Sequence, residues 1–223
     1  MRNISKQLCG FVCVLVLAIF ISEGFEVQAK ESSRWNALLS KYQEQDNVDC
    51  LIFVKYKGSS KADFCMYRKT KSGTWNCVVK CDAYVGQNGI NKSREGDRKT
   101  PTGIYNITMG MGLKKNPGTA VRYKKINRHL YWSARKKDYN TLVDSRKAPG
   151  VYGEHLVEYK PYYNYALVLD YNRKCIYKKG SAIFLHCAAY KQYTQGCIAI
   201  KEKYMKRVMK KVTRNTKICI YRR

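Results

Sequence analysis

IFLH at residues 183–186 and TQGCIAI at residues 194–200 are the stretches that say most about this chain. The apolar run before His186 predicts a β-strand, and ten residues separate this histidine from Cys197. Gly196 permits a tight backbone turn immediately before the sulfur. A histidine that reaches a thiol from a neighbouring strand can act as its base, so the pattern predicts nucleophilic catalysis by Cys197 and His186.

The same stretch contains candidates for the other parts of an acyl-transfer site. The backbone N–H groups of Cys197 and Gly196 are candidate donors to an oxyanion, and Thr194 can hydrogen-bond within the turn. His186 would either remove the thiol proton or hold a thiolate–imidazolium pair. The spacing equally fits a buried cysteine after a turn glycine, beside a histidine satisfied in the core.

Two further blocks extend the pattern. EGDRKTPTGIY occupies residues 95–105, and GEHL at residues 153–156 precedes YALVLDYN at residues 165–172. Together the blocks resemble the L,D-transpeptidase catalytic domain family (YkuD-type), in its branch with a T-x-G-C-I-A nucleophile motif. The resemblance covers roughly residues 50–221, with the blocks in family order.

The resemblance implies a mainly β, sandwich-like fold with a few short helices and an exported peptidoglycan L,D-transpeptidase. Cys197 would form a thioester with a stem tetrapeptide, release D-Ala and pass the acyl group to an amine of another stem. His186 would serve as the base, and no metal or organic cofactor is required. Two alternatives are an L,D-carboxypeptidase, in which water resolves the thioester, and a non-catalytic wall-binding module.

Two positions depart from the commoner family pattern. Position 195 is glutamine where many members have a second histidine, and position 199 is alanine where many have an arginine. The group that holds the substrate carboxylate is therefore open among Lys191, Arg98 and Lys99. We expect the substrate to contact the residues around the nucleophile, namely Thr194, Gln195, Lys191 and Tyr193.

Other residues compete for these roles. Cys187 adjoins His186, but successive strand residues point to opposite faces, so we expect Cys187 to pack in the core. His155 is a second candidate base, although it lies outside the nucleophile block. The aromatic candidates for a substrate groove are Tyr105, Tyr131, Trp132, Tyr139 and Tyr193.

The first 29 residues predict an export signal. Basic residues precede an uncharged run at 8–21, and small residues at 27–29 suit cleavage. The run is shorter than the roughly 20 residues that span a bilayer, so an uncleaved anchor is the alternative. The predicted organisation is a signal at 1–29, an N-terminal helical segment at 30–49 and a catalytic domain at 50–223.

The chain is strongly basic, with 43 lysines and arginines against 16 acids and a net charge of +27. Residues 1–29 contain two bases and two acids, so their removal leaves that charge unchanged. Such an excess predicts a polyanionic neighbourhood. With export predicted and no nucleic-acid motif found, we expect anionic wall polymers such as teichoic acids, and not nucleic acid, as partners of a monomer.

Cysteine usage leaves the disulfides open. Eight of the ten cysteines follow residue 29, and their spacings fit no zinc pattern. An active thiol must stay reduced, which leaves at most three bridges among the other seven. A state in which many of these cysteines are reduced is the alternative.

Periodicity predicts a β-rich chain with two helices. Strands are predicted at 50–56, 62–69 and 74–85 as a meander, at 103–109, near 122–132, at 165–171, at 182–185 and at 217–221. A short helix is predicted at 33–43. A second helix at 202–212 has an apolar stripe formed by Met205, Val208, Met209 and Val212.

Overall fold

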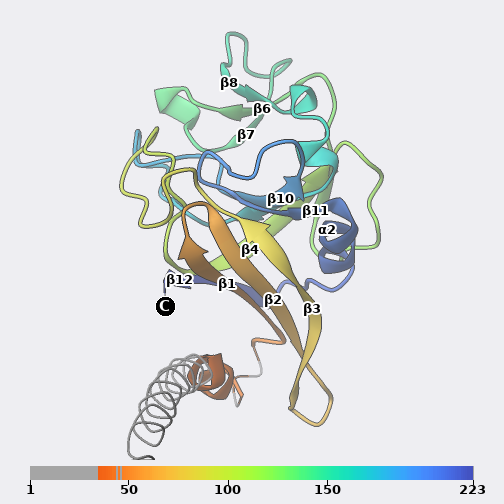
Figure 1. Ribbon diagram of the computed structural model, residues 1–223. Coiled ribbons are helices and arrows are strands. Elements are labelled where there is room, and N and C mark those ends of the chain that lie inside the picture. The colour runs from red at the N-terminus through yellow and green to blue at the C-terminus, as the bar shows by residue number, and fades with distance from the viewer. Residues whose placement is uncertain (1–34, 44, 46, 223) are drawn as a thin grey trace, which may run out of the picture. The chain divides into compact units, whose positions relative to one another are not determined.

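The computed structural model describes residues 35–43, 45 and 47–222 (Figure 1). The export signal predicted at residues 1–29 therefore lies outside the described residues. None of the helices in the described ranges is both long and apolar enough to cross a membrane.

The chain divides into two compact units, Met1–Gln45 and Asp46–Arg223. In the first unit, residues 35–41 form a helix, inside the predicted helical segment. The second unit contains every strand described below.

The second unit is mainly β, which confirms the predicted fold class. Its strands are β1 (Cys50–Gly58), β2 (Lys61–Lys69), β3 (Trp75–Tyr84), β4 (Gly103–Gly112), β5 (Tyr123–Lys125), β6 (Leu130–Ser133), β7 (Leu142–Asp144), β8 (Gly153–His155), β9 (Ala166–Leu169), β10 (Phe184–Ala188), β11 (Ile198–Lys201) and β12 (Thr216–Arg222). Its helices are α2 (Glu202–Met209) and the 3-10 helices η1 (Lys136–Asp138), η2 (Leu156–Glu158) and η3 (Tyr162–Asn164).

Nine strands form one sheet in the order β12-β1-β2-β3-β11-β10-β9-β4-β5. Strands β1, β2 and β3 are the predicted antiparallel meander. Strand β12 pairs with β1 on one side and with β4 on the other, so the sheet closes on itself. The layers of the sandwich are thus joined by continuous backbone hydrogen bonding, which leaves few unpaired strand edges.

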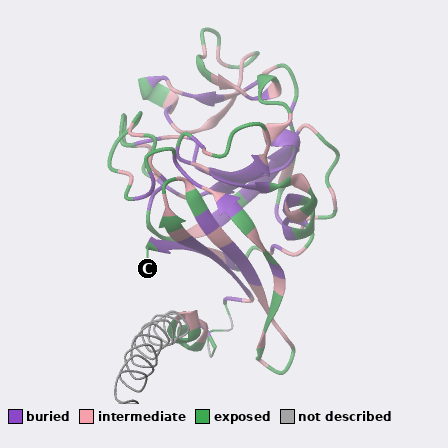
Figure 2. Ribbon diagram, in the orientation of Figure 1, coloured by how far each residue is buried: buried purple, intermediate pink, exposed green. Residues whose placement is uncertain are grey.

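The main core fills the inside of this closed sheet, and its residues are among the buried ones coloured purple in Figure 2. Alternate residues of the strands point inward, as a period of two requires. Helix α2 covers the sheet with Met205, Val208 and Met209, all fully buried, as the predicted stripe requires. It ends at Met209 and not at residue 212, so the fourth predicted member, Val212, is buried beyond the helix. Inward-facing members from the strands include Ile52, Phe64, Leu167, Leu185, Ile198 and Ile218.

A second, smaller cluster lies on the opposite face of β4, β9 and β10. It joins Met111 and Phe184 of the large sheet to Trp132 of a three-stranded sheet ordered β7-β6-β8. Figure 1 shows this small sheet beyond β10 and β11, at the end of the unit away from the β2–β3 hairpin. The residues between the two sheets form the candidate site.

The sequence predictions missed the shortest strands. Strands β7, β8 and β11 have three or four residues each, too few for an alternating pattern to show. The strand predicted near residues 122–132 is two separate strands, β5 and β6, in different sheets. Strand β11 runs directly into α2, with no turn residue to mark where one element ends and the next begins.

Candidate active site

A parallel strand pair brings the two predicted catalytic residues together. In the β10–β11 pairing, Leu185 lies opposite Ile198 and His186 opposite Ala199. Cys197 immediately precedes β11 and packs at the edge of the smaller cluster, next to Phe184. Phe184 and His186 therefore share the face of β10 on which Cys197 lies.

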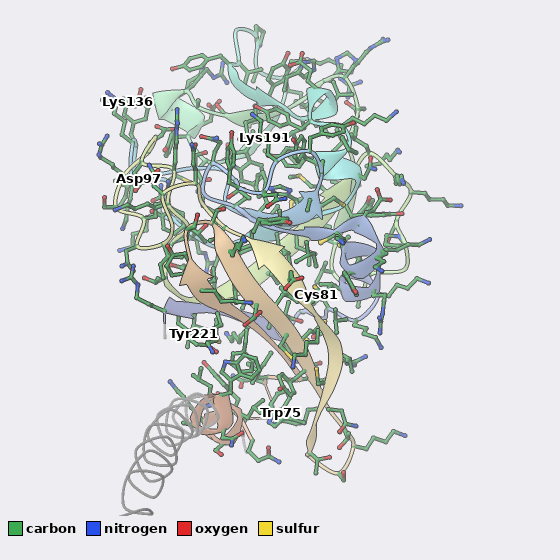
Figure 3. The ribbon with its side chains drawn as sticks, viewed as in Figure 1. Trp75, Cys81, Asp97, Lys136, Lys191 and Tyr221 are labelled. Atoms are coloured by element: carbon green, nitrogen blue, oxygen red, sulfur yellow. The ribbon has the colours of Figure 1, made fainter. Side chains whose placement is uncertain are left out.

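One pocket joins these groups. It has a volume of about 190 Å³ and contains every side chain that the sequence placed around the nucleophile: His186, Lys191, Tyr193, Thr194, Gln195 and Cys197. Figure 3 shows Lys191 between β10 and the small sheet in this view. The remaining lining residues are Glu154, Tyr159, Tyr162 and Tyr163.

The Cys197 thiol is held by the backbone that leads into β10. The Phe184 N–H donates to Sγ at 3.3 Å, and the thiol donates to the Ala182 carbonyl oxygen at 3.0 Å. Burial raises the pKa of Cys197 to about 12, and the nearby Glu154 adds to this rise. The Phe184 N–H and the charge of Lys92 act in the opposite direction. The resting sulfur is therefore a neutral thiol.

His186 is a neutral imidazole in the same pocket. Burial lowers its pKa to about 4, against a hydrogen bond to the Cys187 carbonyl oxygen that acts to raise it. Because that carbonyl at 2.9 Å can only accept, Nδ1 carries the proton and Nε2 is the basic nitrogen. Of the two states that the sequence left open, a neutral pair and a thiolate–imidazolium pair, these directions favour the neutral pair.

The turn before the nucleophile is fixed by a glycine and a threonine. Gly196 has φ +138°, which side-chain-bearing residues rarely adopt, and an added Cβ would lie 2.9 Å from the Lys99 carbonyl oxygen. The Gly196 N–H donates to Thr194 Oγ1 at 3.1 Å, and the Thr194 hydroxyl donates to the Cys197 carbonyl oxygen at 2.7 Å. The Gly196 N–H, one of two predicted oxyanion donors, is thus already engaged within the turn.

The 95–105 block lies directly against this turn. The Thr100 hydroxyl donates to the Cys197 carbonyl oxygen at 3.0 Å and accepts the Gly86 N–H at 2.8 Å. A carbonyl held by two threonine hydroxyls cannot rotate, so the nucleophile's backbone is fixed from both sides. Two sequence blocks about 100 residues apart therefore meet at the same atom.

A buried ion pair shapes the loop that presents Thr100. Lys92 Nζ lies 2.7 Å from Asp97 Oδ1, with only 3% and 7% of the two side chains exposed. Burial acts to raise the pKa of Asp97, but Lys92 and three backbone N–H groups outweigh it and lower the pKa to about 2. Those N–H groups belong to Ser93, Arg94 and Lys99.

Four pocket residues escaped the sequence analysis. Glu154 comes from β8, and its Oε2 accepts the Tyr163 hydroxyl at 2.6 Å. Tyr159 stacks on Tyr163, and the rings of Tyr162 and Tyr163 meet His186 edge-on at 6.1 and 5.6 Å. The tyrosine-dense segment at 159–165 was the available signal, but its spacing does not say which rings face a pocket.

The competing residues lie elsewhere. His155 stacks on Tyr131 at 4.3 Å and hydrogen-bonds Glu158 and the Arg128 carbonyl oxygen, outside the pocket lining. Cys187 belongs to the main core, on the opposite face of β10 from His186, as strand alternation predicts. Burial raises its pKa to about 12.

Some of the candidate carboxylate-binding and groove residues line the pocket, and the others lie outside it. Of the three bases considered, Lys191 lines the pocket, whereas Arg98 donates to Gln87. Among the five aromatic candidates, only Tyr193 lines the pocket. Tyr105 packs on Tyr171, and Tyr139 packs on Tyr177. Tyr131 and Trp132 belong to β6 of the small sheet. Within the described ranges, no three histidines, cysteines or acids are grouped to hold a metal ion.

A thiol and an imidazole in one pocket of a β-sheet domain are the groups that cysteine-dependent acyl transfer uses. Residues 62–220 match the model of the L,D-transpeptidase catalytic domain, YkuD. This match covers more than half of the chain, and the chain belongs to that family. No curated protein sequence matches the chain closely enough to establish a relationship.

Proposed function

We propose that this chain is an exported peptidoglycan L,D-transpeptidase with Cys197 as nucleophile and His186 as base. The observation that carries the proposal is that both side chains line one pocket of a domain from this family. Export itself rests on the sequence pattern at residues 1–29, and wall polymers as partners rest on the net charge of +27.

In the first half-reaction, Cys197 attacks the carbonyl carbon between the third residue and D-Ala of a stem tetrapeptide. His186 Nε2 takes the thiol proton as the C–S bond forms. The same proton then passes to the departing nitrogen, the C–N bond breaks, and D-Ala leaves behind a thioester. An imidazolium whose pKa has been lowered by burial gives up its proton readily, which suits this second step.

The oxyanion of the intermediate requires a donor near Sγ. With the Gly196 N–H engaged by Thr194, the Cys197 N–H is the better placed of the two predicted donors. The two threonine hydroxyls on the Cys197 carbonyl oxygen fix the next peptide unit, so the backbone is held on the C-terminal side of this N–H. Such preorganised donors lower the barrier because they need no rearrangement as charge develops.

Lys191 is our candidate for the substrate carboxylate. It is the only lysine or arginine that lines the pocket in the described part of the chain, and its Nζ lies 5.7 Å from the centroid of the Tyr193 ring. A lysine in this place supplies the charge that the family arginine, replaced by Ala199, would otherwise provide. Gln195 and Tyr193 would complete the contacts to the stem.

Mass spectrometry of muropeptides incubated with the full chain tests the proposal. Cross-linked dimers, formed by the wild type and not by Cys197→Ala, are the expected result. Tripeptides without dimers would instead support the L,D-carboxypeptidase, in which water resolves the thioester. No Cys197-dependent change would overturn catalysis and leave the wall-binding module.

A further inference from the structure

We propose that Glu154 forms the subsite for the acceptor amine, where its carboxylate binds the incoming ammonium group and accepts a proton from it. This inference rests on the proposed function. Glu154 is the one acidic side chain that lines the pocket in the described part of the chain, and it faces the same space as Cys197 and His186. Its neighbour His155 points away and stacks on Tyr131.

The carboxylate has a single protein partner. Tyr163 donates to Oε2 at 2.6 Å, and no other described residue forms a hydrogen bond or ion pair with Glu154. A chain with 43 bases and 16 acids has bases in excess, yet none of those that the structure describes forms an ion pair with this acid. A half-buried carboxylate without a cation is unfavourable, and an ammonium ligand would supply the missing charge.

The protonation behaviour of Glu154 suits the second half-reaction. Burial raises its pKa to about 7, although the Tyr163 hydrogen bond acts to lower it. A base that titrates near neutral pH can both accept a proton from an amine and return it to water. His186, whose pKa is lowered to about 4, is a weaker acceptor for a proton from an ammonium group.

The proton count closes with two bases. The incoming ammonium gives one proton to Glu154, and the neutral amine attacks the thioester carbonyl carbon. The C–N bond forms, the C–S bond breaks, and a second proton passes through His186 to Cys197 Sγ. The third hydrogen stays on the new amide, and Glu154 releases its proton to solvent.

The test measures the two half-reactions separately on the full chain. With a stem tetrapeptide alone, D-Ala release reports thioester formation. With a stem that carries an ammonium acceptor, dimer formation reports aminolysis. Glu154→Gln keeps the shape and the Tyr163 hydrogen bond, so we expect D-Ala release close to wild type but an acceptor kcat/KM lowered about 100-fold.

Two controls separate this role from a structural one. Hydroxylamine is uncharged at neutral pH and needs no proton removal before attack, so Glu154→Gln should form the hydroxamate at the wild-type rate. Glu158→Gln changes an exposed acid that pairs with His155 and should leave both half-reactions unchanged.

The outcomes distinguish a failure of the amine subsite from a failure of the proposed function. Normal D-Ala release with unchanged acceptor kinetics in Glu154→Gln overturns the amine subsite alone. Equal loss of release, aminolysis and hydroxamate formation would also overturn it, since Glu154 would then support the nucleophile. If the wild type shows no Cys197-dependent D-Ala release, the proposed function fails and the subsite fails with it.

A separate observation concerns two cysteines far from the pocket. Cys65 of β2 and Cys77 of β3 have their sulfur atoms 3.1 Å apart, beside a register shift that follows Met66. Cys65 is buried and Cys77 is exposed. We infer that these two thiols are a disulfide site that ties the β2–β3 hairpin across its strands.

The reaction is thiol–disulfide exchange with a small soluble disulfide as the oxidant. The exposed Cys77 thiolate attacks that disulfide, forms a mixed disulfide and releases one small thiol. Cys65 then attacks the Cys77 sulfur and releases the second small thiol. Two protein thiols become one cystine, and the two electrons and two protons end on the small thiols.

Oxidised glutathione is the probe for the full chain. We expect a mass lower by two hydrogen atoms and a Cys65–Cys77 linkage in the peptide map. Cys77→Ser should abolish this linkage, whereas Cys81→Ser, on the same strand but against the main core, should retain it. A map with both thiols reduced, or with either joined to another cysteine, would overturn the site.

Discussion

His186 and Cys187 are neighbours in the sequence but lie in two different environments. His186 and Phe184 form the pocket face of β10, where the imidazole meets tyrosine rings and the space around Cys197. Leu185 and Cys187 form its core face, sealed inside the closed sheet. A single strand therefore separates the chemistry from the packing by one residue.

The two thiols at this strand show what makes a cysteine a candidate nucleophile. Burial raises the pKa of Cys197 and of Cys187 to about 12 alike, so the acidity of the two thiols does not distinguish them. Their neighbours do. Cys197 lines a pocket beside an imidazole, whereas Cys187 Sγ donates to the Tyr165 carbonyl oxygen in the core.

Exchanging sulfur for oxygen on each face is the strongest test of this comparison. Cys197→Ser should lower acyl-enzyme formation on the order of 10⁴-fold, because a hydroxyl is a far weaker nucleophile beside a neutral imidazole. Cys187→Ser should keep the wild-type rate per folded molecule. Carbapenem-type β-lactams, which acylate the family's nucleophile, provide the readout as a covalent mass increase. An adduct that persists in Cys197→Ser and disappears in Cys187→Ser would reverse the assignment.

Removing each histidine gives the next largest effect. His186→Ala deletes the base and should lower turnover by about 10²–10⁴-fold. His155→Ala loses a stacking and hydrogen-bonding contact outside the pocket and should leave turnover measurable. The turnover of a stem peptide by both variants tests this prediction. Equal losses would mean that a place in the pocket lining does not determine which histidine acts as the base.

Truncation should separate stability from binding. Ile200→Ala removes a fully buried side chain of the main core and should cost about 2–5 kcal/mol of unfolding free energy. Lys191→Ala changes an exposed side chain of the pocket and should cost less than about 0.5 kcal/mol. It should instead raise KM for the stem. Denaturant unfolding and KM are measured on both variants. A large loss of unfolding free energy in Lys191→Ala would contradict the prediction.

The Glu154 carboxylate on the pocket side should make the free energy of unfolding depend on pH. The pKa of Glu154 is raised from 4.5 to about 7 in the folded protein, so its stability contribution is complete below pH 4.5 and falls as pH rises through 7. Glu154→Gln mimics the protonated acid. It should match wild type near pH 4 and exceed it by up to about 3 kcal/mol near pH 8. His186 titrates in both proteins and cancels, so a difference that stays flat with pH would contradict the burial of this carboxylate.

The sequence was sufficient where the pattern is local. Alternation and turn residues predicted the β1–β3 meander, and a glycine before a cysteine predicted the turn whose φ at Gly196 is +138°. The stripe of α2 was equally plain because helical periodicity needs only its own residues. Each of these features depends on interactions within one segment.

Features built from distant segments could not be predicted. Glu154 reaches the pocket on a three-residue strand, too short to recognise, and Tyr163 meets it through a 3-10 helix. The family resemblance included the 95–105 block, but the sequence did not show what this block does. In the fold, its Thr100 hydroxyl donates to the Cys197 carbonyl oxygen. Closure of the sheet by β12 and β4 joins strands about 110 residues apart, a pairing that no local pattern specifies.

Salt should have the smallest effect on turnover in the pocket. Its effect on binding through the charged surface should be much larger. The net charge of +27 acts over distance, but attraction between exposed charges is screened within about 8 Å at physiological ionic strength. Binding to wall sacculi should therefore weaken steeply from low to high salt, while turnover of a small soluble stem changes little. Sacculi stripped of teichoic acid are the control. If stripping leaves binding unchanged, or if binding ignores salt, the charge does not hold the protein to anionic wall polymer.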